Sequence, residues 1–185
     1  LTDSAAPAPN PPRNSTKENM AKFTTTHEIN CDANSFWKLF FDSSFNDKLY
    51  LETLGYYEFK IAEHSETDQQ IRQKAVAQPK IYMPGPMAKL FGDNYRYTEE
   101  GTFDKATQVY RWKQIPSVQA DKLRFEGTIR VESIGDRKIR RIMETTVEAK
   151  LFGIGGLVES TMEKQLREQA DRTAAFFNKY VASAA

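Results

Sequence analysis

The sequence predicts an α+β fold in which a curved antiparallel sheet of seven strands wraps around a long C-terminal helix. Six consecutive segments between residues 57 and 151 alternate apolar and charged side chains, which is the period of strands with one face in water. A Thr-rich strand segment precedes them near residues 23–29. After a glycine-rich hinge, the apolar residues recur at the spacing of an amphipathic helix up to about residue 182.

The N-terminal part is predicted to contain one strand and two short helices. The strand covers residues 23–29, and Asp32 or Asn34 can cap the helix that follows. The second helix runs from about residue 46 to 54 and ends at Gly55. The first helix carries an aromatic pattern on two adjacent stripes, formed by Phe36, Trp37, Phe40 and Phe41.

The six later strands are expected at about residues 57–63, 70–78, 95–103, 109–115, 123–132 and 138–151. Pro116 stops the fourth of them, and Gly135 with Asp136 forms a tight turn between the last two. Because these last two strands are unusually long, their sheet must twist and curl. The glycines of residues 153–156 lack the lysine of a phosphate-binding loop, so we expect them to turn the chain into the final helix.

The composition is that of one soluble globular domain. The 185 residues include 26 Lys and Arg against 25 Asp and Glu, and a net charge of +1 argues against binding of nucleic acid as the main task. No apolar run approaches the ~20 residues of a transmembrane helix, so any membrane contact is expected to be peripheral. One cysteine and two histidines leave little material for a metal site, and we expect neither a metal nor a cofactor. The unusual feature is the aromatic content of 12 Phe, 8 Tyr and 2 Trp.

Residues 1–20 are predicted to form a Pro-rich extended tail, with the folded domain at residues 21–183. The tail holds four of the eight prolines and cannot bury enough apolar area to fold alone. It either docks on a protein partner or packs on its own domain. The chain begins with Leu1, which would suit a processed plastid or mitochondrial precursor, although a numbering choice would look the same. The sequence assigns no other compartment.

The order of elements is that of a helix-grip protein and resembles the START-like superfamily, which includes the birch-pollen-allergen type and polyketide cyclase/dehydrase-like proteins. The residues that carry the resemblance are the segments DANSFWKLFFDSSFNDKLY, EGTIRV and KLFGIGGLVE. It extends from about residue 21 to 181, in an uncharacterised branch. The resemblance implies a cavity between sheet and long helix that holds lipid-like, sterol-like, pigment or polyketide-like ligands. It does not identify the ligand.

The candidate ligand-binding residues are those expected on the concave face of the sheet and the inner stripe of the long helix. Aromatic residues and methionines suit an adaptable apolar pocket, although the same side chains could fill a dry core. The apolar members are Tyr57, Phe59, Tyr95, Tyr97, Phe125, Ile129, Met143, Met162, Leu166 and Phe177.

Two charged residues fall in phase with apolar neighbours. Glu99 shares a strand face with Tyr97, and Arg141 shares one with Met143. A buried charge without a partner is costly, so the two side chains either pair with each other or meet a ligand head group. The alternative interpretation is a bulge that turns both of them to solvent.

A loop at residues 79–92 contains three prolines and an apolar cluster. It is a candidate lid over the cavity, a membrane-touching tip or a docking surface for a protein partner. The alternative is a short helix packed over the core. The apolar residues are Ile81, Tyr82, Met83, Met87, Leu90 and Phe91.

Catalysis has little support in the sequence. His27 and His64 have no partner at motif spacing and are expected at the surface or at a sheet edge, and no Ser or Cys nucleophile motif is present. We therefore name no catalytic residue and expect a non-enzymatic carrier or sensor of a hydrophobic small molecule. The alternatives are an accessory or scaffold subunit of a larger assembly and a cyclase- or dehydrase-like enzyme.

Overall fold

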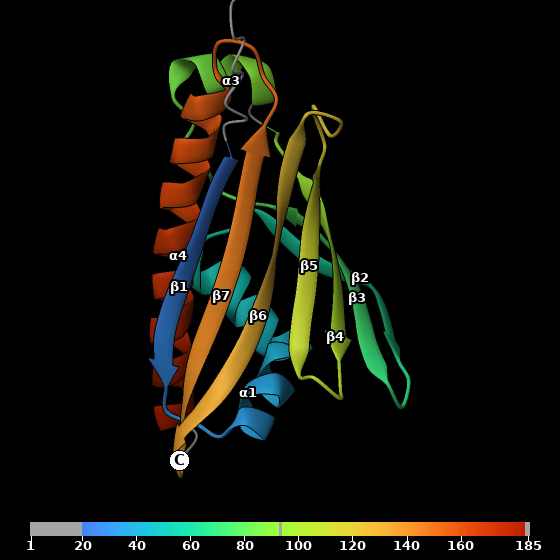
Figure 1. Ribbon diagram of the computed structural model, residues 1–185, viewed down its shortest axis with the longest axis vertical. Helices are drawn as coiled ribbons and strands as arrows, with labels where there is room; N and C mark the ends of the chain where they lie inside the picture. The colour runs from blue at the N-terminus through green and yellow to red at the C-terminus, as the bar shows by residue number, and fades with distance from the viewer. Residues whose placement is uncertain (1–19, 93, 184–185) are drawn as a thin grey trace, which may run out of the picture.

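The computed structural model describes residues 20–92 and 94–183, which form one sheet with a long helix packed along it (Figure 1). The strands are β1 (Met20–Ile29), β2 (Glu58–Glu66), β3 (Gln70–Gln78), β4 (Tyr97–Asp104), β5 (Val109–Pro116), β6 (Leu123–Gly135) and β7 (Lys138–Ala149). The helices are α1 (Ala33–Phe40), α2 (Ser43–Asp47), the π-helical η1 (Lys48–Thr53), α3 (Gly85–Phe91) and α4 (Gly155–Ser183). The predicted helix-grip architecture is confirmed. The predicted tail lies, apart from Met20, outside the described residues.

The sheet is antiparallel throughout, in the order β1-β7-β6-β5-β4-β3-β2. Strands β2 to β7 form a meander, and β1 adds to its far edge beside β7. The two longest strands, β6 and β7, have 13 and 12 residues. In Figure 1 α4 runs alongside β1 and β7, while α1 lies behind the lower part of the sheet. The space between α4 and the inner face of the sheet is therefore enclosed by elements from both ends of the chain.

Glycines allow close packing at the centre of the sheet. Gly101 and Gly127 lie opposite Trp112 on its two sides. A Cβ atom on Gly101 would lie 1.7 Å from the hydroxyl oxygen of Tyr110, and one on Gly127 would lie 2.1 Å from the main-chain oxygen of Glu144. The side chains of Tyr110 and Trp112 thus take up space that residues larger than glycine would need at these positions.

The helices after β1 begin at aspartate caps. Asp32 accepts a hydrogen bond from the Ser35 amide at 2.9 Å, and Asp42 accepts one from the Phe45 amide at 2.7 Å. The second helix therefore begins earlier than the predicted residue 46, and its continuation is wound as a π-helix. Gly55 follows with a φ of +77°, a conformation that glycine adopts without strain.

The prediction that Tyr57 faces the interior with Phe59 is wrong. Tyr57 precedes β2 and is 66% exposed. The chain turns at Gly55, and regular alternation begins only at Glu58. Tyr56 takes the inward position instead, where its hydroxyl donates to Oε1 of Gln169 on α4 at 3.1 Å.

Aromatic side chains join α4 to the short helices. Phe177 is fully buried, and its ring centroid lies 4.9 Å from that of Phe36 on α1 and 4.5 Å from that of Phe45 on α2. Stacked and tilted rings at these separations add to the free energy of burial. One end of the long helix is thereby fixed to both helices that follow β1.

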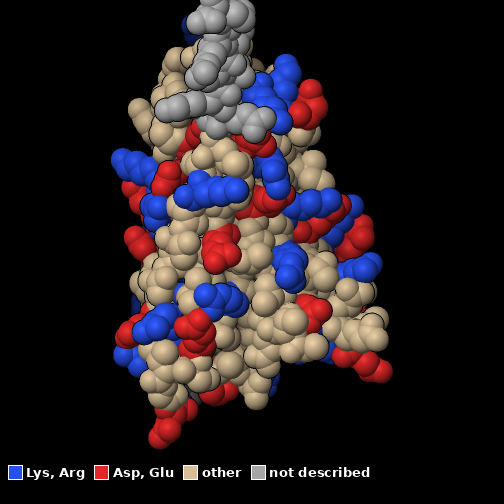
Figure 2. Space-filling model, in the orientation of Figure 1, with Lys and Arg blue, Asp and Glu red and all other residues tan. Residues whose placement is uncertain are grey.

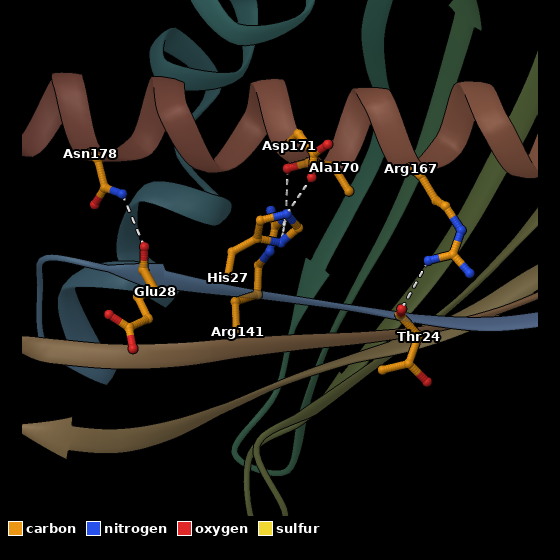
Figure 3. Close-up of polar contacts among 8 residues, drawn as sticks. All are labelled: Thr24, His27, Glu28, Arg141, Arg167, Ala170, Asp171 and Asn178. Atoms are coloured by element: carbon orange, nitrogen blue, oxygen red, sulfur yellow. Dashed lines mark hydrogen bonds and ion pairs between the residues drawn. The ribbon is translucent and has the colours of Figure 1, made fainter.

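Polar contacts connect α4 to the main chain of β1 (Figure 3). Nη1 of Arg167 donates to the Thr24 carbonyl at 3.2 Å, and Nδ2 of Asn178 donates to the Glu28 carbonyl at 3.0 Å. Because β1 is an edge strand, these side chains contact main-chain groups along it. The helix thus contacts the sheet along the edge that its first strand forms.

The loop at residues 79–92 forms a short helix over one end of the molecule. Helix α3 lies near the start of α4 in Figure 1, and Met87 and Phe91 are buried. Tyr82 is 77% exposed, but its main chain is held by Gln165 on α4, which accepts from the Tyr82 amide at 3.2 Å and donates to the carbonyl at 2.8 Å. The apolar cluster is therefore divided between the core and the surface.

Charged side chains of both signs are mixed on the face shown in Figure 2. Exposed pairs such as Arg96 with Glu58, at 2.6 Å, and Lys113 with Glu100, at 2.8 Å, link neighbouring side chains. Such pairs each contribute at most about 1 kcal/mol. No helix in the described part of the chain is long and apolar enough to span a membrane.

Candidate functional site

A cavity lies between the inner face of the sheet and α4. It has a volume of about 100 Å³, counted as the space open to the centre of a water molecule. Its walls come from the helices after β1, from β2 to β7 and from α4, and they are mainly aromatic and aliphatic. Since a single water needs only about 10–15 Å³ on this measure, the space exceeds a packing defect.

A second cavity of about 130 Å³ adjoins the first. The two share Gln114, Leu166 and Gln169 in their linings. The second cavity is bordered by Tyr56 and by the start of the loop at residues 79–81. Two neighbouring volumes under one helix thus extend from the middle of the sheet toward α3.

Eleven of the twelve candidate ligand-binding residues lie in the interior, and Tyr57 is the exception. The first cavity is lined by Phe59, Glu99, Ile129, Arg141, Met143, Leu166 and Phe177. The second is lined by Tyr95, Tyr97, Met162 and again Leu166. Phe125 is fully buried and borders neither cavity, so it belongs to the packed core.

Several lining residues were not among the candidates. Tyr110, Trp112 and Gln114 alternate along β5 and face the first cavity, so their period-two spacing was a usable signal. Tyr50 lines the same cavity from the π-helical segment, where ordinary helical spacing does not apply. Gln73 shares a face of β3 with Ala75, so the same period-two spacing was a usable signal for it as well.

Glu99 borders the cavity on β4. Its Oε2 accepts a hydrogen bond from Nε2 of Gln114 at 3.1 Å, and the hydroxyl of Tyr110 donates to Oε1 at 3.5 Å. Burial raises the pKa of the Glu99 carboxyl above its ordinary value, and the hydrogen bonds from Gln114 and Tyr110 oppose this rise in part. Neutral donors therefore accompany this carboxyl, and no cation forms an ion pair with it among the described residues.

Arg141 borders the same cavity from β7 and is only 4% exposed. Its Nη2 donates to the Ala170 carbonyl at 2.8 Å and to Nδ1 of His27 at 3.1 Å. Burial lowers the pKa of the guanidinium to about 10, so it still carries its charge at neutral pH. The interpretation that a bulge turns Glu99 and Arg141 to solvent is wrong, and the two side chains do not pair with each other either.

His27 joins Arg141 to α4 (Figure 3), and it lies on the edge strand β1, in line with the expectation of a surface or sheet-edge position. Its side chain is 16% exposed, and its Nε2 lies 2.8 Å from Oδ1 of Asp171. A guanidinium can only donate hydrogen bonds, so Nδ1 of His27 accepts from Arg141 and Nε2 carries the proton shared with Asp171. The register of β1 and β7, which pairs His27 with Arg141, places the two side chains together.

The buried carboxyl of Glu99 should make the stability of the protein depend on pH. A carboxyl whose pKa is raised on folding binds its proton more tightly in the folded state. The contribution of Glu99 to the free energy of unfolding is therefore complete below the ordinary pKa of 4.5. It falls as the pH rises from there through the folded pKa of Glu99. Glu99→Gln cannot ionise, so we expect it to reduce this fall and to raise the free energy of unfolding at pH 7. Urea unfolding at several pH values between 4 and 8 measures the effect.

The control for this prediction is Glu100→Gln, on the neighbouring residue. Glu100 pairs with Lys113, and the hydrogen bond from Lys113 lowers its pKa. The pH dependence that Glu100 adds to the free energy of unfolding therefore has the opposite sign, and its stabilising contribution is lost as the pH falls. A pH dependence that is the same for Glu99→Gln and the wild type would show that the Glu99 carboxyl is not desolvated as described.

The residues described for this chain hold no group of three or more His, Cys, Asp or Glu side chains placed to bind a metal ion. The single cysteine, Cys31, is buried next to β1. Burial raises the pKa of its thiol to about 11. The thiol is thus protonated at neutral pH and is a poor nucleophile.

The model of a protein family described as "Protein of unknown function (DUF2505)" matches residues 24–181. The chain belongs to this family. The match extends from β1 to the last turns of α4 and so includes every element that borders the cavities. A search of curated proteins found no match.

Solved structures share the fold at low sequence identity. An aromatase/cyclase from Streptomyces sp. R1128 has a TM-score of 0.60 at 11% identity, covering 88% of this chain and 93% of that chain. A START superfamily protein from Mycobacterium smegmatis has a TM-score of 0.56 at 13% identity, covering 86% and 98%. Norcoclaurine synthase from Thalictrum flavum, solved with dopamine and hydroxybenzaldehyde, has a TM-score of 0.57 at 13% identity, covering 98% of each chain.

The resemblance to the START-like superfamily is thereby confirmed at the level of the fold. The similar structures include two enzymes and a protein named only by its superfamily. One architecture thus serves different chemistries, and function must be argued from the site itself.

Proposed function

We propose that this protein binds a hydrophobic small molecule in the space between the sheet and α4. The observation that carries the proposal is unfilled space inside an aromatic and aliphatic wall. Protein interiors are normally packed as closely as organic crystals, so such a space costs stability unless a ligand occupies it. An apolar enclosure with a few inward-facing polar groups is the usual form of a small-molecule site.

The two cavities suggest the shape of the ligand. They have volumes of about 100 and 130 Å³ and are separated by shared side chains that include Leu166 and Gln169. An aromatic body of one or two rings suits the first cavity. A longer ligand would reach the second by displacing the side chain of Leu166. Tyr56 and Tyr97 provide hydroxyl groups there, 3.3 Å apart, for a polar substituent.

The start of the loop at residues 79–92 is the proposed entrance. Pro79 and Ile81 border the second cavity, whereas Met87 and Phe91 anchor α3 in the core. Gln165 holds the main chain of Tyr82 through two hydrogen bonds. A lid made of residues 79–83 would open by breaking these two bonds while α3 stays in place. The proposed accessory-subunit role has less support, since the buried part of the loop packs on its own domain.

A cyclase- or dehydrase-like reaction is the second candidate function. Glu99 favours it, because a carboxyl with a raised pKa that borders an apolar cavity suits a general acid. This role would require that Glu99→Gln abolish turnover of a bound substrate without weakening its binding. Turnover retained in Glu99→Gln would assign the carboxyl to structure alone.

Filling the cavity is expected to block binding. Ala75 on β3 lines the first cavity, and Ala75→Ile would extend three additional carbon atoms into it. We expect the uncharged fluorescent probe N-phenyl-1-naphthylamine to bind the wild-type protein with a saturable rise in fluorescence. Ala75→Ile should weaken this binding by about tenfold or more, since steric overlap of one side chain costs about 1–3 kcal/mol.

The matched control is Ala62→Ile, which makes the same substitution at an exposed position on β2. It should bind the probe like the wild type, provided that circular dichroism shows both variants to be folded. The proposal is wrong if the wild-type protein gives no saturable signal, or if Ala62→Ile and Ala75→Ile weaken binding equally.

A further inference from the structure

Arg141 is a buried cation that makes no direct ion pair among the described residues, and the carboxylate of Asp171 reaches it only through His27. Of its three guanidinium nitrogens only Nη2 has acceptors among the described residues, namely the Ala170 carbonyl and the His27 ring. The Nε atom of Arg141 is buried and has no hydrogen-bond partner among the residues that the structure describes. Arginine normally uses its planar set of donors on a carboxylate or phosphate. Here part of that set has no acceptor, at the wall of an apolar cavity.

Asp171 and Glu99, the two acids that could offset this charge, are both engaged by other groups. Asp171 contacts Nε2 of His27 at 2.8 Å and makes no ion pair with Arg141 itself. Glu99 lies on β4, with β5 and β6 between it and β7, and accepts hydrogen bonds from Gln114 and Tyr110. A buried charge without a partner is costly to the folded protein. A ligand that supplied an anion would remove that cost.

We propose that the ligand of this cavity is an apolar carboxylic acid whose carboxylate pairs with the guanidinium of Arg141. This inference rests on the proposed function, because it assigns the polar end of a molecule held in the same cavity. The apolar body of the acid would lie against Ile129, Met143 and Leu166.

A carboxylate fits this site better than other charged groups. Arg141 supplies one positive charge, which one carboxylate neutralises, whereas a phosphate monoester would leave excess negative charge among apolar side chains. A cationic ligand would meet repulsion from the guanidinium. Gln114 and Tyr110, the uncharged donors to Glu99, lie elsewhere in the lining and would suit a second, neutral polar group.

The contacts that Arg141 already makes hold it in place for this role. The Ala170 carbonyl and His27 both accept from Nη2, and His27 is in turn held by Asp171 (Figure 3). The guanidinium is therefore fixed before a ligand arrives, which reduces the entropy lost on binding. Asp171 acts through His27 and is a positioning residue.

The test compares 2-naphthoate with 2-naphthamide, two ligands of nearly equal size that differ in charge. Each is titrated at pH 7.5 as a competitor of N-phenyl-1-naphthylamine. We expect the wild-type protein to prefer the naphthoate by about tenfold, the usual worth of a hydrogen bond to a charged group. Arg141→Met should bind both ligands equally. Arg141→Gln, which removes the charge but keeps a polar side chain with N–H donors, should do the same and covers the case in which Arg141→Met fails to fold.

The matched control is Arg140→Met, at the neighbouring residue of β7, whose side chain is 44% exposed and pairs loosely with Glu132. It should keep the wild-type preference. Equal affinities for the two ligands in the wild-type protein, or a preference that survives in Arg141→Met or Arg141→Gln, would overturn the inference while leaving the proposed function intact. Failure of the uncharged probe to bind the wild-type protein would instead overturn the proposed function.

Discussion

Phe177→Ala should lower the free energy of unfolding by about 3–5 kcal/mol, the usual cost of truncating a fully buried phenylalanine. Phe177 stacks on Phe36 and packs against Phe45, so it joins α4 to both short helices. It also lines the first cavity, and its loss would enlarge a space that is already unfilled. The protein would lose the aromatic contact that joins α4 to α1 and α2. Urea unfolding followed by tryptophan fluorescence measures this loss.

The same substitution at Phe152 provides the control. Phe152 lies between β7 and α4 and is fully exposed. Phe152→Ala should change the free energy of unfolding by less than about 0.5 kcal/mol. If the two variants were equally stable, the packing of α4 against α1 and α2 would not be as described.

Gly127→Ala should destabilise the protein by about 3 kcal/mol, at the upper end of the cost of overpacking. The new methyl group would lie 2.1 Å from the main-chain oxygen of Glu144 and 2.9 Å from Cζ2 of Trp112. The oxygen belongs to the neighbouring strand, so it cannot move without disturbing the pairing of β6 with β7. Thermal unfolding should show a clear decrease in Tm, and the near-ultraviolet signal of Trp112 should change.

Gly135→Ala is the matched control on the same strand. Its Cβ atom would lie 3.6 Å from Cβ of Lys138, an ordinary contact distance. Because alanine also restricts the unfolded chain, this variant should be as stable as the wild type or slightly more stable. A Gly127→Ala protein as stable as Gly135→Ala would contradict the close packing at the centre of the sheet.

The fold could be predicted because each strand repeats a simple pattern. The alternation along β6 and β7 continues for more than ten residues, so a single irregular position did not hide it. The stripe from Val158 to Phe177 likewise survives over several turns of α4. Boundaries were less certain, since the π-helical turn at residues 48–53 obeys neither period.

Most of the candidate site was predictable because its residues follow the period of a regular element. Phe59, Ile129 and Met143 follow the period of their strands and line the first cavity. The exception, Tyr57, is two residues from Phe59 but precedes the strand, so the turn at Gly55 decides its direction. Spacing along one strand carries no information about such a turn.

The spacing of residues in the sequence does not predict contacts between residues that are far apart in the chain. The Arg141–His27–Asp171 chain needs the register of β1 with β7 and the position of α4 at once. The cavity itself depends on the sum of side-chain volumes between two elements. Sequence periodicity shows which residues face inward, but it does not show whether they fill the space.

The central claim is that a ligand occupies the cavity bordered by Arg141. A crystal structure of the protein grown with 6-bromo-2-naphthoate tests it most directly, because the anomalous scattering of bromine locates the ligand without an assumed pose. We expect bromine inside the cavity among the side chains of Ile129, Met143 and Leu166, with the carboxylate within hydrogen-bond distance of Arg141. Bromine found only on the outer surface, with the cavity unchanged, would contradict it.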